Sequence, residues 1–349
     1  MPDALIVLIY DSIENSVFES QVLIPLQLHY AHKKLMVISF ERIIPKKSAE
    51  FLQKKYPHIH FIFFKRFPFI VPFFLYYDVW RVKHFLRRFK AYELRARGPL
   101  AGFIAGKLAR GKKCVACLIQ IRGLLAQEYV YTHAQKMHTL HIMRTKMFER
   151  LERKAYSIQC KKVLFEAVSP ALKEYVVHAF GAIAEKIFVA RLDIPSAISP
   201  EMRQVWRQPI RASLGIAYNT TIYCYNGSAK AWQCPELVID FFIKKYAENA
   251  HSFLLVLTQE VHIFETLLQS YKVPKHVFHV RQVAHDEIYA YLAASDVGLI
   301  FRKQHVVNWV SRPTKLLEYQ AVGLAIEHNN TIAWLAQQST QDKIQSADN

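Results

Sequence analysis

The chain has 349 residues, of which 52% are hydrophobic and 21% charged, and this composition excludes a disordered, collagen-like or low-complexity protein. Its length predicts about two domains. The formal net charge of +18 is uneven, because residues 1–200 carry 32 Lys and Arg against 15 Asp and Glu, whereas residues 201–349 carry 14 against 13. A basic half beside a neutral half indicates a polyanionic partner, a membrane or nucleic acid, unless the charge only aids solubility.

The cysteine content and the apolar stretches indicate the cellular compartment of the protein. Five Cys in a chain of this length do not form a disulfide framework, and they fit a reducing cytoplasm. Cys114 and Cys117 have C-x-x-C spacing, but no second pair or nearby His completes a metal site, so we interpret them as buried residues at a strand start. No signal peptide is visible, and the most apolar stretch, 67–77, is shorter than the about 20 residues of a spanning helix. We expect a cytoplasmic protein, soluble or peripheral on the inner membrane face, without a metal or cofactor.

Apolar runs alternate with helical patterns through the first half of the chain. Continuous apolar runs at 4–10 and 35–40 are typical of strands buried on both faces of a parallel sheet. We expect further strands at 60–64, 91–94, 117–121 and 162–166, and helices at 21–34, 49–56, 103–110 and 138–155. This alternation predicts a doubly wound α/β domain.

A second alternation follows a predicted linker at 193–202. Its expected strands are 222–225, 253–257, 277–280 and 297–300, and its expected helices are 235–249, 262–271, 286–294 and 313–322. We therefore predict two Rossmann-like domains, 1–195 and 196–349. They should face each other across a cleft, where ligands sit outside the carboxyl ends of the strands.

One segment of the second half carries the clearest chemistry. A predicted strand ends near Arg302, a polar loop follows, and a helix begins near Pro313, a favourable first-turn residue, with Ser311 near the cap position. Backbone N–H groups at that helix start, beside Arg302 and Lys315, form a ready pocket for a phosphate. Glu318 lies one turn further on, where its carboxylate could bind a ribose diol. On spacing alone, an ordinary capped helix with surface charges explains the segment equally well.

This segment resembles the donor-site motif of family 4 glycosyltransferases with the GT-B fold. The matching residues are Asp296, Gly298, Arg302, Asn308, Ser311, Pro313, Lys315, Glu318, Tyr319, Ala321, Gly323 and Leu324. In that family the Glu that matches Glu318 binds the nucleotide ribose, and the helix start with its basic neighbours holds the diphosphate. The resemblance implies catalytic roles for Arg302, Lys315 and Glu318. The donor site that it implies comprises Gly227, Ser228, Lys230, Arg302, Asn308, Ser311, Pro313, Thr314, Lys315 and Glu318.

Weaker likenesses carry the resemblance from about residue 5 to residue 326. In the first half they cover an opening loop at 10–22, two mid-domain motifs at 97–99 and 121–128, and a closing helix and strand at 149–169. The acceptor-side candidates that they imply are Tyr10, Asp11, Ser20, Gln21, Arg97, Arg122 and Glu128. No convincing general base is found among Asp11, Glu19 and Glu128, which are more commonly structural residues.

The chain departs from the family pattern at four places. Val310 stands where the family has the first acid of an E-x7-E pair. Ser228 and Gln233 stand where many members have Arg and Lys, and Gln120 replaces a common Asp. The sequence also ends about 25 residues after Gly323, before the additional helices usual for this fold.

Taken with the resemblance, these patterns predict a retaining, metal-independent glycosyltransferase. It would move a sugar from a nucleoside diphosphate sugar to a glycan or lipid-linked acceptor, in surface polysaccharide biosynthesis. Metal independence is expected because no D-x-D motif occurs, and helix N–H groups with Lys and Arg can stabilise a leaving diphosphate. The departures leave two alternatives, a catalytically inactive nucleotide-binding or assembly protein of the same fold and a nucleotide-sugar epimerase.

The stretch 54–97 indicates which polyanionic partner the basic half binds. It holds 11 Lys and Arg against two acids, interleaved with many aromatic residues. No nucleic-acid module signature occurs, so an anionic membrane surface suits these residues better than nucleic acid. Residues 79–89 would form an interfacial helix. The alternative is that the aromatic residues fill the domain core and only the charges face solvent.

Overall fold

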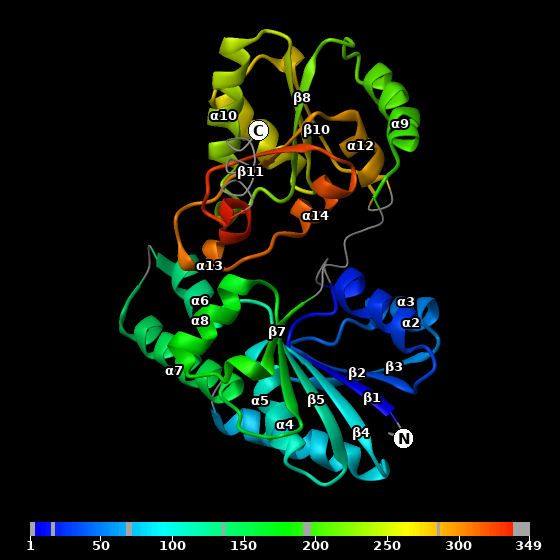
Figure 1. The fold of residues 1–349 in the computed structure, drawn as a ribbon, viewed down its shortest axis with the longest axis vertical. Coiled ribbons are helices and arrows are strands. Elements are labelled where there is room, and N and C mark those ends of the chain that lie inside the picture. The colour runs from blue at the N-terminus through cyan, green and yellow to red at the C-terminus, as the bar shows by residue number, and fades with distance from the viewer. Residues whose placement is uncertain are drawn as a thin grey trace, which may run out of the picture. The chain divides into compact units, whose positions relative to one another are not determined.

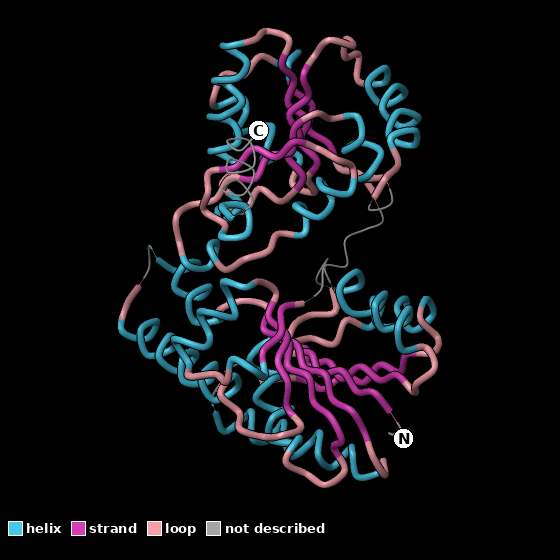
Figure 2. Tube along the Cα trace, viewed as in Figure 1, coloured by secondary structure: helices cyan, strands magenta, loops and turns pink. Residues whose placement is uncertain are grey.

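The computed structural model describes residues 4–14, 18–67, 72–134, 137–190, 197–284 and 287–337. The chain divides into two compact units, residues 1–190 and 191–349. The predicted boundary between residues 195 and 196 lies within 191–196, outside the described residues. Each unit is an α/β domain built on its own parallel sheet (Figures 1 and 2), as predicted.

The first unit contains a seven-stranded parallel sheet in the order β3-β2-β1-β4-β5-β6-β7. Its strands are β1 (Ala4–Ile9), β2 (Leu35–Glu41), β3 (Ile59–Lys65), β4 (Tyr92–Arg97), β5 (Cys114–Ile121), β6 (Val163–Ala167) and β7 (Ile187–Val189). Every residue of β1 and β2 is buried, which confirms that these apolar runs are covered on both faces. The sequence prediction missed β7.

Helices cover this sheet, and Figure 1 shows α4, α5 and α7 along one side of it. The helices are α2 (Ile24–Tyr30), α3 (Lys46–Lys55), α4 (Pro72–Phe85), α5 (Gly98–Ala109), α6 (Leu125–His133), α7 (Thr139–Tyr156) and α8 (Pro170–Phe180). Local signals fix α8, because the hydroxyl of Ser169 accepts a hydrogen bond from the N–H of Leu172 at 3.0 Å and Gly181 ends the helix at φ 67°. The expected helix at 21–34 is instead a π-helical turn (Glu19–Leu23) followed by α2.

The second unit contains a five-stranded parallel sheet in the order β10-β9-β8-β11-β12. Its strands are β8 (Thr221–Asn226), β9 (Ser252–Leu257), β10 (Phe278–Arg281), β11 (Val297–Ile300) and β12 (Ala325–His328). Its helices are α9 (Pro200–Ser213), α10 (Pro235–Glu248), α11 (Val261–Ser270), α12 (Ile288–Ala294), α13 (Val306–Trp309) and α14 (Thr314–Ala321). The predicted strands and the helices that match α10, α11, α12 and α14 are confirmed to within a few residues.

The linker prediction is wrong at its C-terminal end, because α9 begins at Pro200. The hydroxyl of Ser199 accepts a hydrogen bond from the N–H of Met202 at 3.2 Å, and a proline in the first turn completes a regular helix start. Arg203, Arg207 and Arg211 then follow at a spacing of four residues and lie on one face of the helix.

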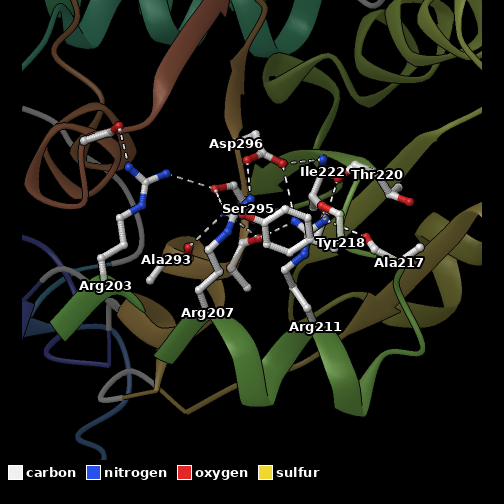
Figure 3. Close-up of polar contacts among 12 residues, drawn as sticks. Arg203, Arg207, Arg211, Ala217, Tyr218, Thr220, Ile222, Ala293, Ser295 and Asp296 are labelled. Carbon is white, nitrogen blue, oxygen red and sulfur yellow. Dashed lines mark hydrogen bonds and ion pairs between the residues drawn. The ribbon is translucent and has the colours of Figure 1, made fainter. Parts of the chain in front are cut away.

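These three arginines hold α9 against the rest of its unit. Figure 3 shows their side chains pointing from α9 toward the segment that contains Ser295 and Asp296. Arg207 donates to the carbonyl of Ala294 at 3.1 Å and to Asp296 at 2.6 Å. Arg211 donates to the carbonyls of Ala217 at 2.9 Å and Thr220 at 2.5 Å. Guanidinium groups beside the last carbonyls of α12 also complement the negative end of that helix.

Asp296 is a structural residue in this network. Its carboxylate accepts from Arg207, from Arg211 at 3.4 Å and from the backbone N–H of Ile222 at 2.8 Å. Asp296 belongs to the donor motif, but its carboxylate joins α9 to the start of β8 and β11.

Candidate functional site

The donor-motif residues gather where β8 and β11 end and α14 begins. β8 and β11 are neighbours, with Gly298 opposite Cys224, so both strands end at the same edge of the sheet. A Cβ added at Gly227, directly after β8, would lie 2.6 Å from Nζ of Lys315. A side chain at this position would displace the ammonium group, so the glycine lets Lys315 approach the end of β8.

Two buried cations meet at one amide in this site. Arg302 and Lys315 are 4% and 6% exposed. The guanidinium of Arg302 donates to the backbone carbonyl of Gln233 at 3.1 Å and also to its side-chain oxygen Oε1. The Lys315 ammonium donates to the same Oε1 at 3.2 Å. The side-chain oxygen of Gln233 is thus shared by two positive charges.

The electrostatics of Lys315 are unfavourable without an anion. Its ammonium lies 4.1 Å from the centroid of the Tyr225 ring. Among the described residues, no carboxylate lies within ion-pairing distance of it. Burial, and next the charge of Arg302, hold the pKa of Lys315 well below its usual value, while Glu318 opposes them. An anion in place of the neutral amide oxygen would stabilise this buried cation pair.

Glu318 lies on the adjoining face of α14. Its carboxylate accepts a hydrogen bond at 2.6 Å from the side-chain amide of Asn226, the last residue of β8. The neighbouring hydroxyl of Tyr319 accepts from the N–H of Asn226 at 2.9 Å and donates to the carbonyl of Cys224 at 3.2 Å. A Cβ at Gly298 would lie 2.4 Å from the Tyr319 ring, so that glycine makes room for the ring. These contacts fix α14, and with it Glu318, against β8.

The other donor-side candidates lie around this cluster in different roles. Ser311 does not cap α14, because its hydroxyl donates to the carbonyl of Asn308 at 2.8 Å and Pro313 is the cap residue. Asn308 is buried, and its amide donates to the carbonyl of Lys303 at 2.9 Å. Lys230 is exposed and lies over the Trp232 ring. The remaining candidates are Ser228, whose carbonyl accepts from the Tyr225 hydroxyl at 2.8 Å, and Thr314, which is exposed.

The acceptor-side candidates form a second cluster in the first unit. β1, β4 and β5 are neighbours, with Ile9 opposite Arg97 and Arg97 opposite Gln120, so Asp11, Arg97 and Arg122 come from the same sheet edge. Arg97 donates to the side-chain oxygen of Gln21 at 2.5 Å, and Arg122 donates to the same oxygen. Nη1 of Arg97 is buried without a hydrogen-bond partner among the described residues. This N–H group can donate a hydrogen bond to a water molecule or to an oxygen of a ligand.

Two acids stand beside this cluster. Burial lowers the pKa of Arg97, and the charge of Asp11, on the exposed loop after β1, opposes this shift. Glu128, in the first turn of α6, is exposed. A Cβ at Gly123 would lie 2.1 Å from Oε1 of Glu128, so the glycine admits the carboxyl group. Of the three general-base candidates, Asp11 and Glu128 thus lie at this edge, whereas Glu19 accepts from Tyr56 at 2.6 Å and pairs with Lys55.

Glu152 anchors α6 and hence Glu128. Its buried carboxylate accepts from the N–H groups of Leu125 at 2.6 Å and Ala126 at 3.2 Å, the first two residues of α6. Burial raises its pKa to about 8, although both N–H groups act against this.

The raised pKa of Glu152 predicts how stability depends on pH. The folded protein holds this proton more tightly than the unfolded chain, so the stabilisation is present below the unfolded pKa of about 4.5 and is lost as pH rises toward 8. The free energy of unfolding should fall by a few kcal/mol over this range. Urea titrations of the Glu152→Gln protein should give a flatter pH profile. The control variant Glu174→Gln, at an exposed position on α8, should keep the original profile, and equal profiles for all three proteins would contradict this assignment.

Two acceptor-side candidates fall outside the cluster. The hydroxyl of Tyr10 donates to Asp78 at 2.8 Å, and its ring stacks on Phe40 at 4.8 Å, which makes it part of the packing between β1, β2 and α4. The side chain of Ser20 lies outside the described residues.

Sequence reasoning missed the neutral residues that organise the donor cluster. The family pattern marks Gln233 as a departure and does not predict that it binds both cations. The pattern assigns no role to Asn226, although its place at the carboxyl end of a central strand is a usable signal.

Comparisons with known proteins agree with this architecture. No family model and no curated protein matches the sequence. Solved structures do match. A glycosyltransferase from Rickettsia africae gives a TM-score of 0.63 at 14% identity, covering 94% of this chain and 79% of that one. WaaG, a glycosyltransferase involved in lipopolysaccharide biosynthesis, gives 0.62 at 15% identity, covering 97% and 84%. A sucrose-phosphate synthase from Thermosynechococcus elongatus gives 0.63 at 14% identity, covering 93% and 81%. The chain therefore has the two-domain GT-B fold.

Two features are absent from the residues that the structure describes. No helix there combines the length and apolar character needed to cross a bilayer. No group of three or more His, Cys, Asp or Glu side chains is placed to hold a metal ion within the same ranges.

Proposed function

We propose that this chain is a glycosyltransferase that moves a sugar from a nucleoside diphosphate sugar to a glycan or lipid-linked acceptor. The observation that carries the proposal is the buried pair Arg302 and Lys315, joined through one oxygen of Gln233 at the start of α14. The resemblance of the same segment to family 4 glycosyltransferases supports it, as does the fold shared with WaaG, whose own role is in lipopolysaccharide biosynthesis. A role in surface polysaccharide assembly follows as part of the proposal.

The diphosphate would take the place that Gln233 now fills. A phosphate oxygen that displaces the amide oxygen receives hydrogen bonds from two cations and removes their mutual repulsion. Departure of the sugar concentrates negative charge on the diphosphate, and the same groups stabilise it more strongly in the transition state than in the ground state. Because Lys and Arg supply this charge, the proposed reaction needs no divalent metal.

The acceptor would bind at the sheet edge of the first unit. The unpartnered Nη1 of Arg97 can donate to an acceptor oxygen, and Gln21 holds Arg97 and Arg122 in place. Asp11 and Glu128 are the groups there that could receive a proton from an acceptor hydroxyl. Retention of the anomeric configuration is proposed from the family resemblance.

Glu318 should bind the donor ribose, and its loss gives a direct test. A charge-assisted hydrogen bond contributes about 1.5–3 kcal/mol, so Glu318→Ala should weaken binding of UDP or GDP at least about tenfold in calorimetric titrations. It should also lower nucleotide release from a panel of UDP and GDP sugars. Glu327→Ala, which removes an exposed carboxylate on β12, should leave both unchanged. Equal affinity in the Glu318→Ala and unaltered proteins would remove Glu318 from the site.

A further inference from the structure

Helix α4 carries a row of aromatic side chains that face solvent. Phe73, Tyr76, Tyr77 and Trp80 are 73%, 48%, 40% and 57% exposed. Their spacing of three and four residues places them on one face of the helix. We call these four residues the aromatic stripe.

The opposite face of α4 already supplies the contacts with the core. Leu75, Val82 and Leu86, in and just after α4, are at most 2% exposed. Asp78 is fully buried and bonded to Tyr10 and Arg81. The helix therefore has a core face and, separately, an apolar face that the described residues of its own unit leave 40–73% exposed. Side chains of this size gathered on one exposed face mark an interaction surface.

The charges around the aromatic stripe are positive. Lys83, Arg87 and Arg88 are exposed at the C-terminal end of α4 and in the turn after it. On neighbouring elements, Lys107 lies over the Tyr76 ring at 5.4 Å, and Lys113 donates to the carbonyl of Arg87 at 2.6 Å. Asp78 is the one acid in α4, and it is buried. The surface therefore complements an anionic partner.

An open hollow lies at the end of the aromatic stripe. It has a volume of about 610 Å³, and its lining includes Trp80, His84, Phe85, Arg87 and Arg88. The Arg88 guanidinium lies 3.6 Å from the centre of the Phe85 ring. Aromatic walls beside cations suit a phosphate that is attached to an apolar body.

We propose that α4 seats the first unit on a bilayer rich in anionic phospholipid. The aromatic stripe would lie in the headgroup layer, which Trp and Tyr prefer, and the cations would contact lipid phosphates. Single-stranded nucleic acid is held in a groove, whereas these rings run along the outward face of one helix. Of the aromatic residues in 54–97, these four do not fill the core, whereas Tyr56, Phe89 and Tyr92 do. This surface acts independently of the proposed glycosyl transfer.

Co-sedimentation with vesicles tests the charges. The protein should bind vesicles of equal parts phosphatidylglycerol and phosphatidylcholine at low salt, bind pure phosphatidylcholine weakly, and dissociate as salt shortens the screening length. Lys83→Glu with Arg87→Glu should lower the partition coefficient at least about thirtyfold, because each basic residue near the surface contributes about fivefold. The control pair Lys46→Glu with Lys47→Glu reverses two exposed charges on α3 and should have a much smaller effect.

The same assay tests the aromatic stripe. Phe73→Ser with Trp80→Ser should weaken vesicle binding, whereas Phe51→Ser, which removes a 60% exposed ring on α3, should not. Far-ultraviolet circular dichroism would show that all variants are folded. Vesicle binding that is equal in all variants would overturn the proposal. So would binding to a single-stranded oligonucleotide without binding to either vesicle, or a stripe variant that loses self-association but keeps vesicle binding.

Discussion

Replacing Lys315 with Met is expected to weaken UDP or GDP binding by about 10- to 100-fold, because a hydrogen bond to a charged group contributes about 1.5–3 kcal/mol. Uridine and guanosine should bind with little change, since Lys315 is assigned to the diphosphate. The ratio of the two losses, measured by calorimetry, separates a phosphate contact from general damage to the site. Similar losses for nucleoside and diphosphate would show that this charge assignment is wrong.

The same variant should be at least as stable as the unaltered protein. Met fills a similar volume without a charge, and the buried Lys315 ammonium is repelled by Arg302. Replacing a buried charge that lacks a charged partner with an apolar side chain is often neutral or stabilising. Lost affinity with a retained or raised melting temperature would mark Lys315 as a residue kept for binding. Lys244→Met, at an exposed lysine on α10, is the control and should change neither quantity much.

Arg211→Ala is expected to lower the free energy of unfolding of the second unit by about 3 kcal/mol. Arg211 is 3% exposed and donates to the carbonyls of Ala217, Thr220 and Ala294 as well as to Asp296. Removing one partner of a buried charged network leaves the others without compensation, at a cost of about 3–5 kcal/mol.

Urea unfolding followed by tryptophan fluorescence suits this test, because four of the five Trp residues lie in the second unit. Arg203→Ala should have a smaller effect, since Arg203 donates to the carbonyls of Ser295 and Gly323 without the Asp296 ion pair. Lys244→Ala, at an exposed position on α10, should have almost none. If Arg211→Ala and Lys244→Ala unfold at the same urea concentration, α9 is not held by this network.

The sheets could be predicted because β1, β2 and β9 are buried on both faces, which requires continuous apolar runs such as those at 4–9 and 253–257. Helix α9 could not be predicted from an apolar run. It binds its unit largely through arginines, and Pro200 and Pro209 make its sequence resemble a linker. The repeat of Arg203, Arg207 and Arg211 and the cap at Ser199 were the signals for it.

The residues of the candidate site could also be predicted only in part. Arg302, Lys315 and Glu318 could be named in advance because their spacing matches a known motif. Gln233 could not, because it reaches Arg302 and Lys315 across about 70 and 80 residues of sequence, and an amide in a loop carries no signal of its own. Long-range neutral partners of charged residues emerge only from the fold.

Calorimetric titration of the unaltered protein with UDP and GDP, in two buffers of different ionisation enthalpy, tests the central claim most directly. The buried cation pair should bind at least one diphosphate more tightly than its nucleoside. Because burial and Arg302 lower the pKa of Lys315, an arriving diphosphate should raise it again and draw a proton from the buffer, increasingly so as pH rises. Binding with proton uptake, absent in the Lys315→Met protein, is the predicted result. No binding of either diphosphate, or binding no tighter than that of the nucleosides, would contradict the account.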